Sequence, residues 1–229
     1  AEWDGARMAE GLLMGLTGAA LLLGFGLCVL RGRRRERVVR STLRLAVAVA
    51  GFSVMAFELI LIFLAQALFG YVYQRLAFIV SLFMAGLALG AFWVRRHENA
   101  DSRAAWGLTV GACSGLVMLG VGLPLGLNGG WESRVAAEAV LHGCMMAAGV
   151  AGGILFPMVN RLLRARGEGL TEAAGESLAA DNLGAAVGSV TAGVVLIPVL
   201  GVAMTCFVLA VANAYLALVL AILRWSDGA

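Results

Sequence analysis

The sequence contains no lysine, and its two histidines, three prolines and four cysteines are spread thinly over 229 residues. The cysteines lie in four different apolar segments, as Cys28, Cys113, Cys144 and Cys206. Because there is no CxxC pair and no Cys/His cluster, the pattern gives no support for a structural zinc site, a c-type haem or a disulfide framework. A self-contained haem-b subunit needs paired histidines inside the membrane, but only His142 lies in an apolar segment.

Motifs for catalysis and nucleotide binding are also lacking. The chain has no candidate catalytic triad, and its glycines fall on predicted helix faces instead of in a strand–loop–helix phosphate cradle. The sequence therefore predicts no enzyme activity, no cofactor and no metal site.

Charged residues make up only 14% of the chain, against 61% hydrophobic residues and a mean hydropathy of +0.92. No soluble domain needs so much apolar surface. The apolar residues form seven segments, at 11–30, 45–69, 76–94, 104–125, 135–155, 178–199 and 203–223. None alternates with a period of two residues, as outer-membrane strands do. The sequence predicts an all-α, polytopic membrane bundle of about seven transmembrane helices.

The arginines are distributed unevenly between the two sides of such a bundle. With seven spans, 14 of the 17 arginines fall on one side, and Arg7, Arg75 and Arg134 fall on the other. By the positive-inside rule we expect the N-terminus outside and the C-terminus inside the inner membrane of a bacterium. Because the chain begins at Ala1, a removed leader or an upstream domain is expected.

The most arginine-rich loop is interpreted as an anchor on anionic lipid. Its candidate residues are Arg31, Arg33, Arg34, Arg35, Arg37 and Arg40. No aromatic residues interleave with them, so we expect no nucleic-acid partner.

Small residues at a spacing of four predict where the helices touch, because close backbone approach drives helix packing in lipid. The predicted contact faces are Gly86 with Gly90, Gly107 with Gly111 and Gly115, Gly149 with Gly153, and Gly184 with Gly188. Pro157 is expected to kink the fifth span, since it removes the N–H partner of the Gly153 carbonyl.

Glu58 is the polar residue deepest in a predicted span. At about 1.5 Å per residue it lies roughly 20 Å from the start of its apolar segment, near mid-bilayer, with Gln66 at the edge of the same helical stripe. An ionisable group there costs several kcal/mol on most estimates and must face protein or a wet cavity. The other helices are therefore expected to shield it.

Further polar candidates lie on the fifth and sixth spans. Glu138 and His142 are i,i+4 neighbours, and His142 lies at a depth where it can meet Glu58. Asp181 and Asn182 are expected to open the sixth span, where a carboxylate serves as a helix N-terminal charge. One interpretation is a carboxylate–histidine site for a proton or cation. The alternative is a protonated Glu58 bonded to a neighbouring helix, with Glu138 and His142 solvated.

Six stretches resemble the membrane domain of bacterial membrane-bound spermidine synthase-like proteins, at 51–58, 69–74, 83–90, 152–157, 180–188 and 196–201. The resemblance implies a six-helix membrane domain over 45–229, preceded by an extra helix and arginine-rich loop over 1–44. That family often carries a fused aminopropyltransferase domain, but its nucleotide-binding loop has no counterpart in this sequence. The recurring intramembrane glutamate and proline of the family match Glu58 and Pro157.

Two functions follow as hypotheses. The first is a non-catalytic membrane module that binds or passes a small cation, such as a polyamine, or a proton. The second is an anchoring subunit of a larger respiratory or electron-transfer membrane complex, with other membrane or peripheral subunits as partners.

Overall fold

The computed structural model describes residues 35–70, 73–96, 102–128 and 134–227. Over these ranges the chain is helical, without strands, which confirms the all-α prediction. The elements are α2 (Arg35–Phe69), α3 (Tyr73–Arg96), α4 (Ser102–Asn128), α5 (Arg134–Arg164), α6 (Leu170–Thr191), the π-helical turn η1 (Ala192–Leu196) and α7 (Ile197–Asp227). The expected first span at 11–30 and Arg31, Arg33 and Arg34 lie outside the described residues.

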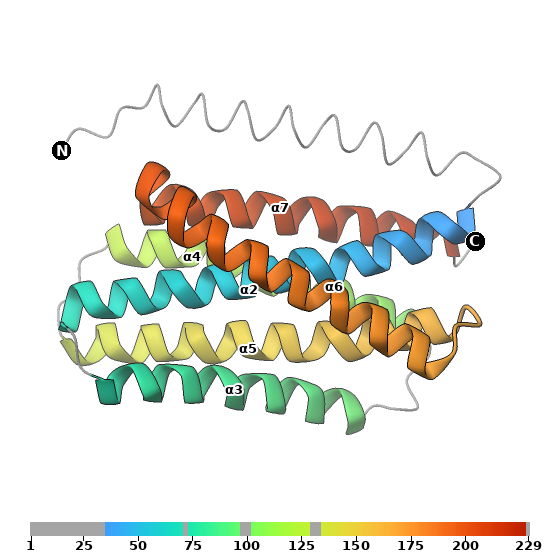
Figure 1. Ribbon diagram of the computed structural model, residues 1–229, viewed down its shortest axis with the longest axis horizontal. Helices are drawn as coiled ribbons and strands as arrows, with labels where there is room; N and C mark the ends of the chain where they lie inside the picture. The colour runs from blue at the N-terminus through green and yellow to red at the C-terminus, as the bar shows by residue number, and fades with distance from the viewer. Residues whose placement is uncertain (1–34, 71–72, 97–101, 129–133, 228–229) are drawn as a thin grey trace.

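Five helical stretches of the described chain are long and apolar enough to cross a membrane: Glu36–Phe69, Leu76–Arg96, Ala104–Leu123, Val135–Arg164 and Leu170–Trp225. The last has 56 residues and includes α6, η1 and α7. Its backbone leaves the helical conformation at Gly201, where φ is 78° and ψ is 169°. Figure 1 shows α6 and α7 running in opposite directions, so this stretch doubles back on itself.

Successive helices alternate in direction, so one end of the bundle collects most of the described arginines (Figure 1). We call it the arginine-rich end. It comprises the start of α2, the ends of α3, α5 and α7, and the turn before α6, with Arg37, Arg40, Arg44, Arg95, Arg96, Arg161, Arg164, Arg166 and Arg224.

Helices α3 and α5 run parallel and approach each other at glycines. A Cβ added at Gly86, Gly90, Gly149 or Gly153 would lie closer than 3.0 Å to a backbone carbonyl oxygen of the partner helix. No side chain fits there, which is why the residues at this spacing are glycine. These are two of the contact faces that the sequence predicted.

The other two tight pairs are α2 with α6 and α4 with α7. Gly184 and Gly188 of α6 pack against the backbone of Ala48 and Phe52 in α2. On α4 the predicted stripe is wrong at Gly111 and Gly115, since nothing lies within 4 Å of a Cβ added there. The close approach to α7 is instead at Gly120, which packs on Cys206.

Three helices extend further than their apolar segments predicted. Helix α2 begins at Arg35, so part of the predicted arginine-rich loop is helical; its Val39 and Leu43 are buried between the arginines. Helix α5 continues without a break through Pro157 to Arg164, and α6 begins at Leu170. The added turns are amphipathic, and a search for continuous apolar runs misses such turns.

Candidate functional site

A cavity with a volume of about 380 Å³ lies between α2, α3, α5 and α6. We call it the Asp181 cavity. Its walls include Gly51, Val54 and Met55 of α2, Phe83, Leu87 and Ala91 of α3, Gly152, Gly153, Phe156 and Pro157 of α5, and Leu178, Asp181, Asn182 and Ala185 of α6. Asp181 is the only ionisable residue among its lining residues, and no arginine lines it.

The structure corrects the predicted position of Asp181. Because α6 begins at Leu170, Asp181 lies 11 residues inside the helix, about 16 Å from its start, and does not act as a helix N-terminal charge. Its carboxylate packs over Gly51 of α2, where an added Cβ would lie 2.6 Å from Asp181 Oδ1. A residue larger than glycine at position 51 would therefore displace the carboxylate.

Pro157 also changes the backbone hydrogen bonding of α5 beside this cavity. Pro157 has no N–H, so the carbonyl oxygen of Gly153 lacks its usual helical donor. Both residues line the cavity. A ligand with N–H donors therefore finds the Asp181 carboxylate and the Asn182 amide among mostly apolar walls.

Glu58 lies in the interior of α2 and is 9% exposed. At about 100° per residue, it continues the α2 face formed by Gly51, Val54 and Met55 by one turn. It does not line the Asp181 cavity, and it does not line the cavity that contains His142. The sequence predicted that Glu58 and His142 can meet in one site, but neither of these cavities contains both residues.

A second cavity, of about 290 Å³, lies at the end of α2 and the starts of α3 and α5, away from the arginine-rich end. We call it the His142 cavity. It is lined by Ala65 and Phe69 of α2, Gln74, Phe78 and Ile79 of α3, and Glu138, Leu141 and His142 of α5. The Phe78 and His142 rings meet edge to face, with centroids 5.1 Å apart and an interplanar angle of 87°. Glu138 and His142 thus line the same cavity, as their spacing predicted. Gln74 also lines it, whereas Gln66 does not.

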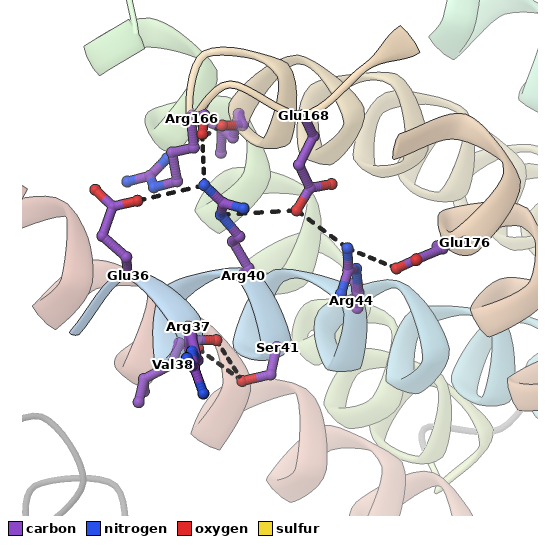
Figure 2. Close-up of polar contacts among 10 residues, drawn as sticks. Glu36, Arg37, Val38, Arg40, Ser41, Arg44, Arg166, Glu168 and Glu176 are labelled. Atoms are coloured by element: carbon purple, nitrogen blue, oxygen red, sulfur yellow. Dashed lines mark hydrogen bonds and ion pairs between the residues drawn. The ribbon is translucent and has the colours of Figure 1, made fainter. Parts of the chain in front are cut away.

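The arginine-rich end contains a buried carboxylate that sequence reasoning missed. The Glu168 side chain is 2% exposed, and Arg44 Nη2 donates to its Oε1 at 3.0 Å (Figure 2). Arg44 also pairs with Glu176 of α6. Arg40 lies 3.8 Å from Glu168 Oε1 and donates to the Arg166 carbonyl oxygen at 2.6 Å. This network joins the start of α2 to the turn between α5 and α6.

The network changes the interpretation of the arginine-rich segment. Arg37 is exposed, as a lipid anchor requires, but Arg40 and Arg44 are half-buried and bind protein carboxylates. An i,i+4 pair of arginines beside the buried Val39 and Leu43 is the signal that could have indicated this inward-facing role.

Comparison of the chain with protein-family models, characterised proteins and solved structures finds no match. The resemblance to spermidine synthase-like membrane domains therefore stays a prediction, and the functional argument depends on the geometry of the two cavities.

Proposed function

We propose that this chain is a non-catalytic membrane module that binds a small organic cation in the Asp181 cavity. The observation that carries the proposal is the position of Asp181, deep in α6 on the wall of a cavity whose other walls are mostly apolar and contain no arginine. Arg40 and Arg44 instead pair with Glu36, Glu168 and Glu176 at the arginine-rich end.

Charge energetics support a cation as the ligand. An unpaired carboxylate at membrane depth costs several kcal/mol on most estimates. A bound ammonium group offsets that cost, and its carbon chain gains from contact with Val54, Phe83 and Leu87. Primary and secondary amines with short alkyl chains combine both features. Together with the family resemblance, this makes spermidine the first ligand to test.

The membrane arrangement is part of the same proposal. The described helices, with the last stretch doubling back at Gly201, and the expected span at 11–30 together make seven passes. The arginine-rich end is placed in the cytoplasm by the positive-inside rule, in the inner membrane of a bacterium. The Asp181 cavity then lies nearer the cytoplasmic side.

The test is equilibrium binding of radiolabelled spermidine to the purified chain in nanodiscs. We expect Asp181→Asn to weaken binding at least about tenfold, which corresponds to about 1.4 kcal/mol. Glu172→Gln is the matched control, because it removes the same charge from an exposed position on the same helix. We expect it to leave the affinity within about twofold, or 0.4 kcal/mol.

If both variants lose affinity for spermidine equally, general electrostatic attraction explains the binding, and a specific site at Asp181 is refuted. Absence of spermidine binding by the wild-type chain would refute the proposal itself. That result would favour the second hypothesis, an anchoring subunit of a larger membrane complex.

A further inference from the structure

The Asp181 and His142 cavities are built on the same three helices. Helices α2, α3 and α5 contribute to both, and α6 joins them only at the Asp181 cavity. On α2 the lining residues run from Gly51, Val54 and Met55 to Ala65 and Phe69. At about 100° per residue these positions form one continuous stripe of the helix. The two cavities therefore lie at two levels of one face of the bundle.

Glu58 lies on this stripe between the two cavities. It is one turn beyond Val54 and Met55, and seven residues before Ala65. Its direction on the helix falls in the middle of the directions of the lining residues. It is the one acidic residue of α2 between the cavities.

The contacts between helices indicate what else lies at this level. A Cβ at Gly152 of α5 would be 3.6 Å from the Val54 side chain, so these residues face each other. Helices α2 and α5 run antiparallel (Figure 1). One further turn from the Val54–Gly152 contact therefore brings Glu58 level with the part of α5 around Gly149. Gly149 packs against the backbone of Phe83 in α3. Glu58 and Phe83 are therefore at about the same depth.

Phe83 is suited to separate the two cavities. It is 4% exposed, lines the Asp181 cavity and belongs to the same buried cluster as Ile79 and Leu141 of the His142 cavity. On α3 it follows Ile79 of the His142 cavity by four residues, so it stands at the boundary between the two sets of lining residues.

Acidic groups recur along this face. Asp181 packs on Gly51, and Glu58 follows Gly51 by seven residues, or about 10 Å. On the antiparallel α5, Glu138 of the His142 cavity lies 14 residues before Gly152, which places it about ten residues, or about 15 Å, beyond Glu58. A cation moving along the face would therefore pass Asp181, Glu58 and Glu138 in this order.

We propose that the two cavities are the ends of one translocation path, with Glu58 as its intermediate cation site and the Phe83 side chain as the barrier between them. This inference rests on the proposed function and deepens it, because it makes the Asp181 cavity one end of a route across the membrane. Phe78 and Glu138 both line the His142 cavity, which suits this end of the path to an organic cation, because aromatic rings and carboxylates both attract such cations.

The experiment measures exchange of radiolabelled spermidine into proteoliposomes loaded with unlabelled spermidine, alongside binding to the same preparations in nanodiscs. We expect Glu58→Gln to reduce exchange at least about tenfold while spermidine binding stays within about threefold of wild type, because Asp181 is unchanged. Phe83→Ala is expected to accelerate exchange severalfold. Phe92→Ala is the control, because it removes a ring from an exposed position on the same helix.

The outcomes separate the two proposals. If the wild type binds spermidine but does not exchange it, the path is wrong and the binding function stands. If Glu58→Gln exchanges spermidine at the wild-type rate, the route through Glu58 is wrong. If Glu58→Gln is not recovered folded, an unchanged rate in Phe83→Ala overturns the proposal by itself. Failure of the wild type to bind overturns both.

Discussion

Removal of the Glu168 carboxylate is expected to destabilise the bundle by about 2 kcal/mol. A hydrogen bond to a charged group contributes about 1.5–3 kcal/mol, and Arg44 donates one to Glu168 at 3.0 Å. The contact with Arg40 at 3.8 Å adds little. The loss is smaller than the 3–5 kcal/mol of a broken buried pair, because Arg44 keeps Glu176 and Arg40 keeps the Arg166 carbonyl. Burial of Glu168 Oε2 without a partner lowers the net value further.

The assay is unfolding of Glu168→Ala by SDS in mixed micelles, followed by far-ultraviolet circular dichroism. Glu36→Ala is the matched control, because Glu36 also pairs with Arg40, at 3.5 Å, but its side chain is 75% exposed. We expect that control to lose less than about 0.5 kcal/mol, as is usual for an exposed i,i+4 pair. Equal destabilisation by the two substitutions, or none in Glu168→Ala, would refute the buried-network argument.

Two further predictions concern packing and topology. Gly90→Ala should destabilise the bundle by about 1–3 kcal/mol, because the added Cβ overlaps the Val150 carbonyl oxygen. Gly111→Ala should be neutral or stabilising by up to about 1 kcal/mol, since nothing lies within 4 Å of a Cβ added there. The SDS titration measures both variants, and equal losses of stability would contradict the α3–α5 contact. Helix α7 ends at the arginine-rich end, which is expected in the cytoplasm, so green fluorescent protein fused after residue 229 should fluoresce and alkaline phosphatase fused there should be inactive. An inactive fluorescent protein with an active phosphatase would contradict this orientation.

The sequence predicted the helices well because long apolar runs dominate their energetics in a membrane. It predicted the glycine contacts of α3 with α5 because only small residues permit that backbone approach. It missed the helix ends, where charged residues alternate with buried ones such as Val39 and Leu43. The displaced start of α6 then led to the wrong interpretation of Asp181, since a helix terminus and a helix interior give a carboxylate opposite environments.

The polar contacts between distant segments could not be predicted in the same way. Glu168 lies in a short polar turn that has the composition of a solvated loop, and its burial depends on the packing of α2 beside α6. The separation of Glu58 from the His142 cavity likewise follows from helix register. Counting residues along each span could not show that His142 lines a cavity from which Glu58 is absent.

The most direct test of a cation site at Asp181 is its chemical modification by a membrane-permeant carbodiimide, measured by mass spectrometry with and without spermidine. Dicyclohexylcarbodiimide reaches carboxyl groups within apolar surroundings, and Glu172 on the same helix supplies an exposed internal reference. We expect saturating spermidine to slow modification of Asp181 at least about fivefold, an apparent difference of about 1 kcal/mol, and to leave Glu172 unchanged. Modification of Asp181 at the same rate with and without spermidine would contradict the account.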